Sequence, residues 1–173
     1  MNATTSGRRA GPRPTIRELG EPGDLGWVVM VHGELYAQEH GWRGELETLT
    51  CEIVAGYARR GDRAREAAWI AERDGERVGC VFCVGDPVET DVALLRILLV
   101  TPAARRLGLG ATLVERAVEF ARAAGYARMR LWTNHPLEDA ARLYRGHGFE
   151  LVAAEPHTSF GVALVGQTYE RAL

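Results

Sequence analysis

The sequence contains no lysine, and all 21 of its basic residues are arginine. A phosphate-binding P-loop needs a lysine followed by Ser or Thr, so this class of nucleotide site is excluded. Against 23 acidic residues, the arginines leave a formal net charge of -2. The chain as a whole therefore has no electrostatic attraction to nucleic acid or to an anionic membrane.

Cysteine is also scarce, and the three residues Cys51, Cys80 and Cys83 are an odd number that does not suit a disulfide framework. Cys80 and Cys83 form a C-x-x-C in a run with the pattern of a strand, where residues three apart point to opposite faces. A tetrahedral zinc site would need a second such pair, and the histidine spacings are not those of metal ligands. We therefore expect buried core thiols and no metal site.

Long apolar runs are missing too, and the N-terminus lacks the apolar segment of a signal peptide, so the sequence predicts a cytoplasmic protein without membrane contact. Residues 1–14 are small, polar and basic. We expect a disordered tail there, with nucleic-acid binding by its arginines as a lower-ranked alternative. Residues 15–173 contain no linker or internal repeat and have the length of a single domain.

Hydrophobic periodicity predicts one mixed α/β sheet. The strand, crossover helix and strand in the middle of the chain form a βαβ unit, whose two strands should be parallel. Asp24 is the expected N-cap of the first helix, and Asp74-Gly75 is the expected hairpin turn. The predicted strands are Thr15–Leu19, Ala67–Arg73, Arg77–Val84, Val92–Val100, Arg128–Thr133, Phe149–Ala153 and Val162–Arg171. The predicted helices are Leu25–His40, Arg43–Arg60, Leu109–Ala124 and Leu137–Gly146.

The stretch from Ile97 to Val114 organises the chain, because an apolar strand ends at Pro102 and a helical pattern begins at Leu109 after a basic loop with two glycines. A helix N-terminus presents unpaired amides and the positive end of the helix dipole, which stabilise an anion such as phosphate. A dinucleotide fingerprint fails here, since Leu113 stands where its third glycine belongs. From these residues alone, a phosphate site and a simple turn with surface arginines both stay open.

The pattern Arg105-x-x-Gly108-x-Gly110 resembles the R/Q-x-x-G-x-G/A acyl-CoA signature of the GNAT family, the GCN5-related N-acetyltransferases. Downstream, Asn134 matches a frequent Asn after the next strand. The segment Ala141–Phe149 is similar to the family's L-Y-x-x-x-G-F helix end. The predicted element order is also that of the GNAT fold, and several weak motifs in one order support each other.

Two segments near the C-terminus, Glu155–Gly161 and Leu164–Glu170, further resemble GNAT domains that are fused to MarR-type regulators. The family resemblance implies a mostly antiparallel sheet with a central parallel strand pair that splays apart. It also implies acetyl-CoA as cosubstrate between these strands and an amine, on a small molecule or a protein, as acceptor. A homodimer is the family-level expectation.

The resemblance assigns the cofactor to the strand before the loop, to the loop amides and to the Asn. Arg106 departs from the pattern, since many family members have Gly there, so the first loop amide is held differently. The implied cofactor-binding residues are Leu98, Leu99, Val100, Arg105, Arg106, Leu107, Gly108, Leu109, Gly110, Ala111 and Asn134.

Tyr144 carries over from the family as the general acid that protonates the leaving thiolate, with a core aromatic as the alternative interpretation. The family's base is often a Glu on the strand before the loop, but this strand has no carboxylate. The remaining candidates are Glu34, Glu39 and His40 on the first helix, or a chain of waters. A catalytically silent acyl-CoA-binding sensor or regulatory partner domain is therefore the alternative to an enzyme.

Overall fold

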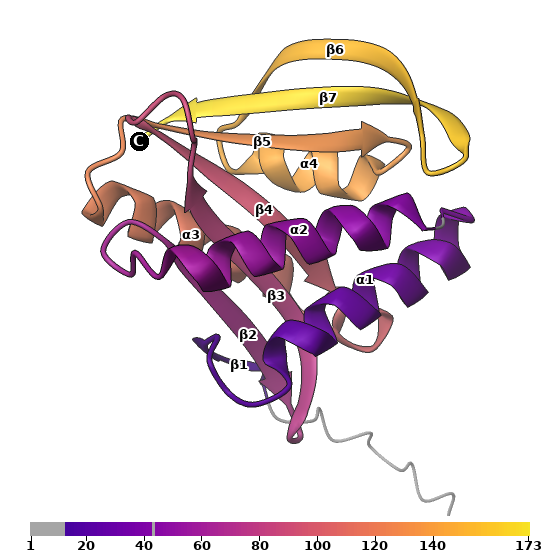
Figure 1. Cartoon of the computed structure of the whole chain (residues 1–173), viewed down its shortest axis with the longest axis horizontal. Helices are drawn as coiled ribbons and strands as arrows, with labels where there is room; N and C mark the ends of the chain where they lie inside the picture. Colours follow the sequence, from indigo (N-terminus) through magenta and orange to yellow (C-terminus); the bar gives the residue numbers. More distant parts are fainter. Residues whose placement is uncertain (1–12, 43) are drawn as a thin grey trace, which may run out of the picture.

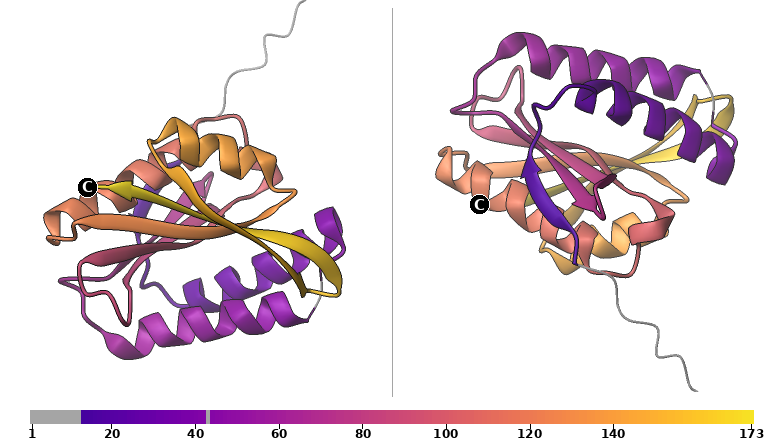
Figure 2. Two further views of the ribbon diagram at one scale, coloured as in Figure 1. Left: turned by 90° about the horizontal axis from the view of Figure 1, so that it is seen from above. Right: turned by 90° about the horizontal axis from the view of Figure 1, so that it is seen from below.

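The computed structural model describes residues 13–42 and 44–173, so most of the expected N-terminal tail lies outside the described residues. Seven strands form one sheet in the order β1-β2-β3-β4-β5-β7-β6. Helices α1 and α2 cover one face of the sheet, and α3 and α4 cover the other (Figures 1 and 2). The elements are β1 (Thr15–Glu18), α1 (Asp24–His40), α2 (Glu45–Arg60), β2 (Ala67–Arg73), β3 (Glu76–Gly85), β4 (Val92–Val100), the 3-10 turn η1 (Pro102–Ala104), α3 (Leu109–Ala123), β5 (Arg128–His135), α4 (Glu138–Gly146), β6 (Glu150–Ser159) and β7 (Val162–Ala172).

The sheet is antiparallel except between β4 and β5, which run parallel as the βαβ pattern predicts. Their backbone pairing extends only from Val92–Arg128 to Leu95–Leu131. Past this point β5 stays paired with β7 on its other side. The expected mixed, mostly antiparallel sheet with a central parallel pair that separates is thus confirmed.

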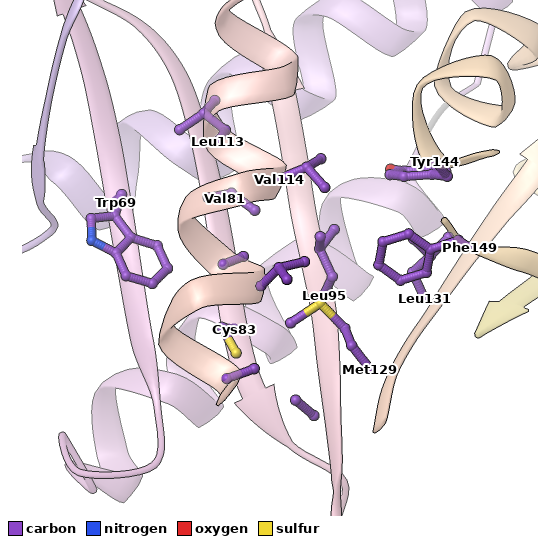
Figure 3. Packing of buried hydrophobic residues seen from close by; sticks show 14 of the residues in the cluster. Trp69, Val81, Cys83, Leu95, Leu113, Val114, Met129, Leu131, Tyr144 and Phe149 are labelled. Atoms are coloured by element: carbon purple, nitrogen blue, oxygen red, sulfur yellow. The ribbon is translucent and has the colours of Figure 1, made fainter. Parts of the chain in front are cut away.

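The core has two main parts, one on each face of the sheet, and a smaller third cluster of Trp42, Phe160 and Leu164. Helix α3 buries the apolar stripe that its sequence predicts, including Leu113 and Val114 against Val81 (Figure 3). Cys80 is buried under α1 and α2, whereas Cys83 is buried under α3. The C-x-x-C therefore serves packing on two opposite faces, as expected from strand alternation.

The prediction that Asp24 caps the first helix is wrong. Gly23 occupies the cap position with φ of 90°, and the structure gives it no capping side chain. The buried Asp24 carboxylate turns back instead, where it accepts hydrogen bonds from the amides of Gly20 and Glu21 at 2.9 Å. Its side-chain partners are Arg17 and Arg77, and Arg77 comes from β3, far along the chain.

The loop predicted after Ala153 is also wrong, because β6 continues to Ser159 and pairs with β7 along its length. Pro156 is tolerated there since β6 is the edge strand of the sheet, where a missing N–H disrupts no ladder. Only Phe160 and Gly161 connect β6 to β7, with φ of 58° and 81°, as in a two-residue hairpin turn. The helices of the described residues include none long and apolar enough to cross a membrane.

Candidate active site

An opening lies between β4 and β5 beyond Leu95, and a bulge in β4 shapes it. Ile97 and Leu98 together stand opposite the single residue Val81, and Ile97 has a φ of 56°. The Cys80 thiol donates a hydrogen bond to the Ile97 carbonyl at 3.3 Å, on the side away from the opening. Because a bulge bends a strand and increases its twist, β4 diverges from β5 here.

The backbone of β4 directs hydrogen-bonding groups into this opening. The amide of Thr101 donates to the Val78 carbonyl of β3 at 2.9 Å. The Leu99 carbonyl also faces β3, since it would lie 3.0 Å from a Cβ placed on Gly79. Strand alternation then turns the backbone groups of Val100 away from β3, towards β5, whereas Leu98 lies in the bulge, where regular alternation is interrupted.

Loop amides line the wide end of the opening. Gly108 precedes α3 with φ of 77°, and the first backbone bond of the helix runs from the Thr112 amide to the Gly108 carbonyl at 3.1 Å. Within residues 13–42 and 44–173, the amides from Leu107 to Ala111 donate to no acceptor outside a regular helix or strand. Five successive donors at a helix N-terminus form a site for an anion.

The two arginines of this loop differ in their conformation and partners. Arg105 pairs with the Glu39 carboxylate of α1 at 2.7 Å and donates to the Val100 carbonyl at 3.2 Å, so it fastens the loop to α1. Arg106 has a φ of 62°, in the left-handed region that glycine adopts without strain. The departure from the family pattern at Arg106 therefore costs backbone strain.

A cavity of about 110 Å³ occupies the narrow end of the opening, between the β4–β5 pair, α1, α2, α4 and the β6–β7 turn. The stacked rings of Trp42 and Phe160, whose centroids are 5.2 Å apart, contribute to its wall. No carboxylate of the described residues lines it. The lining residues are His32, Tyr36, Trp42, Leu46, Leu49, Thr50, Ile53, Leu95, Arg96, Ile97, Leu98, Trp132, Thr133, Asn134, Leu137, Tyr144 and Phe160.

Tyr144 of α4 reaches this cavity from the opposite side of the sheet opening. Its ring packs beside Phe149 and Leu131 (Figure 3), with 6.0 Å between the Tyr144 and Phe149 centroids. Burial, with a smaller contribution from Tyr36, raises the pKa of Tyr144. The phenol is therefore protonated at neutral pH, and Tyr144 is one of the residues that line the cavity.

His32 of α1 is a buried cavity residue that the sequence analysis left out of its candidate site. Its Nδ1 lies 2.8 Å from the Val28 carbonyl, which fixes the proton on that nitrogen and leaves the Nε2 lone pair free. Burial lowers the pKa of His32 to about 4, although the hydrogen bond to Val28 opposes this shift. The imidazole is thus neutral at pH 7.

The three residues expected as base or acceptor site lie outside the cavity lining. Glu34 is exposed, and Glu39 is held by Arg105. The His40 ring packs at a tilt against Tyr36 and Trp42, with centroid distances of 5.8 Å and 5.1 Å. The helical spacing that joins His32 to Tyr36 was the available signal for the buried residue, since both lie on the apolar stripe of α1.

Asn134 is buried at the end of β5 and lines the cavity. Its Oδ1 lies 2.7 Å from Nε2 of His157, whose Nδ1 lies 3.0 Å from Oγ of Ser159. This chain occupies the Asn134 oxygen and leaves the amide nitrogen for a ligand. Sequence reasoning missed His157 because it placed that residue in a loop.

The residues that the structure describes include no group of three or more His, Cys, Asp or Glu side chains placed to hold a metal ion. What the fold and the site define is a protein for an extended ligand. Strand groups without a β5 partner face one side of the opening, amides without a backbone acceptor lie at one end, and a protonated phenol lies at the other.

Comparisons with known proteins agree with this class. The profile of the Acetyltransferase (GNAT) family matches residues 31–149, so the chain belongs to the GNAT family. An uncharacterized N-acetyltransferase of Escherichia coli is 37% identical over 102 residues, or 57% of this chain and 58% of that protein. An uncharacterized N-acetyltransferase of Methanocaldococcus jannaschii is 28% identical over 92 residues, or 51% of this chain and 41% of that protein.

The chain therefore spans about half the length of the curated relatives it matches. Solved structures are similar over more of it. A protein of Salmonella typhimurium, solved with its cofactor acetyl-CoA, has a TM-score of 0.75 at 22% identity, covering 94% of this chain and 95% of its own. At this level of identity the similarity shows the fold.

Proposed function

We propose that the protein is an acetyl-CoA-dependent N-acetyltransferase that moves the acetyl group directly to the amine of its acceptor. The observation that carries the proposal is the opening between β4 and β5, because pairing stops at Leu95–Leu131 while the amides from Leu107 to Ala111 at its far end donate to no backbone acceptor. Family membership supports the same cosubstrate.

The residues present fit acetyl-CoA along its length. The amides from Leu107 to Ala111 would hold the pyrophosphate. Backbone groups of Leu98 and Val100 would pair with the pantetheine arm in the manner of an added strand, and the Asn134 amide nitrogen would donate to it. When bound, the thioester supplies the acetyl group, and its carbonyl would take a hydrogen bond from a β4 amide near Leu98.

The reaction joins the acceptor nitrogen to the acetyl carbon and breaks the carbon–sulfur bond, so one proton must leave the amine and one must reach the sulfur. Tyr144 is placed to supply the second proton, because burial keeps its phenol protonated. The first proton leaves through a chain of waters, because burial lowers the pKa of His32 and makes this cavity residue a weak base. A cavity lining without carboxylates favours a neutral amine, the form that attacks.

The same lining supports a second candidate, a catalytically silent acyl-CoA-binding domain, because no carboxylate of the described residues lines the cavity as a base. The kinship of Glu155–Gly161 and Leu164–Glu170 with regulator-linked GNAT domains, the homodimer and the cytoplasmic location stay predictions. We propose no regulatory partner from them.

Two measurements on the full chain separate the candidates. Titration calorimetry with acetyl-CoA measures binding, and release of free thiol in the presence of a panel of amines measures turnover. The enzyme requires both binding and amine-dependent thiol release. Binding with no thiol released by any amine would leave the silent domain, and no binding at all would overturn both proposals.

A further inference from the structure

Arg96 of β4 is a cation without a partner at the wall of the cavity. It is half-buried and lies on the face of β4 covered by α2, one residue past the last β4–β5 pair. Within the described residues, the Arg96 guanidinium makes no ion pair within 4.0 Å and donates no hydrogen bond. Burial lowers its pKa, but an arginine side chain stays charged at neutral pH.

Three carboxylates near Arg96 form no ion pair with it within 4.0 Å in the described residues: Asp62, Glu66 and Asp86. Arg96 also lines a neighbouring cavity of about 380 Å³ to which these three acidic residues contribute. Glu66 pairs with Arg60 at 2.7 Å. Asp86 accepts hydrogen bonds from the amides that follow it, at 2.9 and 3.0 Å, and lies 3.6 Å from Arg130. The five donors of Arg96 are therefore available to a ligand.

The position of Arg96 separates it from the phosphate loop. It precedes Val100 by four residues, or about 13 Å along an extended strand, and the loop amides lie beyond Val100. Arg96 instead lines the same cavity as Tyr144 and His32, at the reacting end. An anion bound there belongs to the acceptor and not to the cofactor.

We propose that Arg96 binds the carboxylate of the acceptor, and that the acceptor is a free apolar or aromatic α-amino acid. A guanidinium matches a carboxylate through two parallel hydrogen bonds. Aromatic and aliphatic side chains such as Trp42, Leu46 and Ile53 supply the wall for an apolar body. Polyamines do not fit, because a cavity with a cation and no lining carboxylate repels a second positive charge.

This inference rests on the proposed function for the identity of the site, but binding tests it independently of turnover. Calorimetry on the full chain saturated with coenzyme A compares L-phenylalanine, L-methionine and L-leucine with the amide of each amino acid. We expect the acid of at least one pair to bind about 10- to 100-fold more tightly than its amide, the range for a hydrogen bond to a charged group. The same ratio should appear in kcat/KM for thiol release.

Arg96→Met removes the charge while keeping a long apolar side chain, and Arg59→Met on the exposed surface of α2 is the matched control. Arg96→Met should reduce the preference for acid over amide to less than threefold, whereas Arg59→Met should leave it unchanged. Arg96→Met should fold with an unchanged or higher Tm, since it removes a desolvated charge without a partner.

The inference is overturned if no acid binds more than twofold better than its amide, or if the preference survives in Arg96→Met. Thiol release with uncharged amines but no preference for acids would overturn the inference and leave the proposed function standing. Acid-selective binding without thiol release from any amine would support the inference and overturn the proposed function.

Discussion

Two charged sites in this molecule contrast in how their charges are satisfied. Asp24, at the start of α1, is 1% exposed and accepts hydrogen bonds from Arg17 at 2.8 and 2.9 Å, from Arg77 at 2.8 Å and from two backbone amides. Arg96, in the middle of the sheet, is half-buried and has no partner among the described residues. One site is complete within the chain, and the other lacks its counterion.

The satisfied charge of Asp24 stabilises the fold, whereas the donors around the opening are available for binding. Burial opposes ionisation of Asp24, but the hydrogen bonds from Arg17, Gly20 and Arg77 outweigh it and lower its pKa well below the usual range. Around the β4–β5 opening, the desolvation of Arg96 and the unpaired loop amides have no such compensation in the chain. The donors of Arg96 and of the loop are not bonded within the described residues, so they are free to bind a ligand.

The largest change in stability is expected from Asp24→Asn, which leaves Arg17 and Arg77 without their carboxylate. The free energy of unfolding should fall by about 3–5 kcal/mol, as when one partner of a buried pair is removed. Urea denaturation measures it. Asp91→Asn, in an exposed pair 3.5 Å from Arg128, is the control and should cost less than about 1 kcal/mol. Similar losses of unfolding free energy in Asp24→Asn and Asp91→Asn would contradict the claim that the buried Asp24 site contributes more than an exposed ion pair.

His32 gives the cavity a pH dependence that the Asp24 site does not share. Its folded pKa of about 4 lies below the unfolded value of 6.5, so the unfolded state binds the proton first. Stability from His32 is therefore complete above pH 6.5 and decreases as the pH falls towards 4, by about 3 kcal/mol. Asp24, with its lowered pKa, loses its contribution only below the pKa of a free carboxyl, near 4.

Unfolding curves of the native chain and of His32→Gln between pH 4 and 8 test this assignment. The difference in free energy between the two proteins should be constant above pH 6.5 and should change as the pH falls from 6.5 to 4. A difference that does not vary with pH over that window would mean that His32 is not buried in the neutral form.

Tyr144→Phe tests the reacting end of the opening. Removing the proton donor should lower kcat about 100-fold, while the Kd for acetyl-CoA changes less than about twofold, since a general acid acts only on the chemical step. Steady-state thiol release and calorimetry measure the two quantities. Unchanged turnover would make Tyr144 a core aromatic.

The smallest effect is expected at Arg106, where left-handed backbone carries a Cβ. Arg106→Gly should raise the free energy of unfolding by about 0.5–1 kcal/mol, because the strain relieved exceeds the entropy that glycine adds to the unfolded chain. Gly108→Ala, at φ of 77°, should have the opposite sign. Thermal unfolding compares the two variants, and stabilisation by both would contradict the strain argument.

The sequence predicted what local periodicity determines. The alternating and helical patterns placed the strands, the parallel β4–β5 pair and the stripe of α3 that carries Leu113. It did not predict the partners of Asp24, because Arg77 is 53 residues away in the chain. The pairing of Pro156 in β6 depends on its place at the sheet edge, which only the assembled sheet reveals.

In the candidate site, too, some residues were predictable from local sequence patterns and others were not. Arg105, Gly108 and Tyr144 belong to motifs with fixed spacing, so the sequence singled them out. The depth of His32 and the missing partner of Arg96 are properties of packing between α1, α2 and the sheet. Spacing along a helix or strand shows which residues share a face, but it does not show which of them lose contact with water.

Amide hydrogen exchange, followed by NMR with and without acetyl-CoA, tests the central claim most directly. We predict that acetyl-CoA slows exchange at the unpaired amides from Leu107 to Ala111 and at Leu98 and Val100. The amides of Gly20 and Glu21, already bonded to Asp24, should exchange at the same rate in both states. Binding of acetyl-CoA without protection of the loop amides, or no binding, would contradict the account.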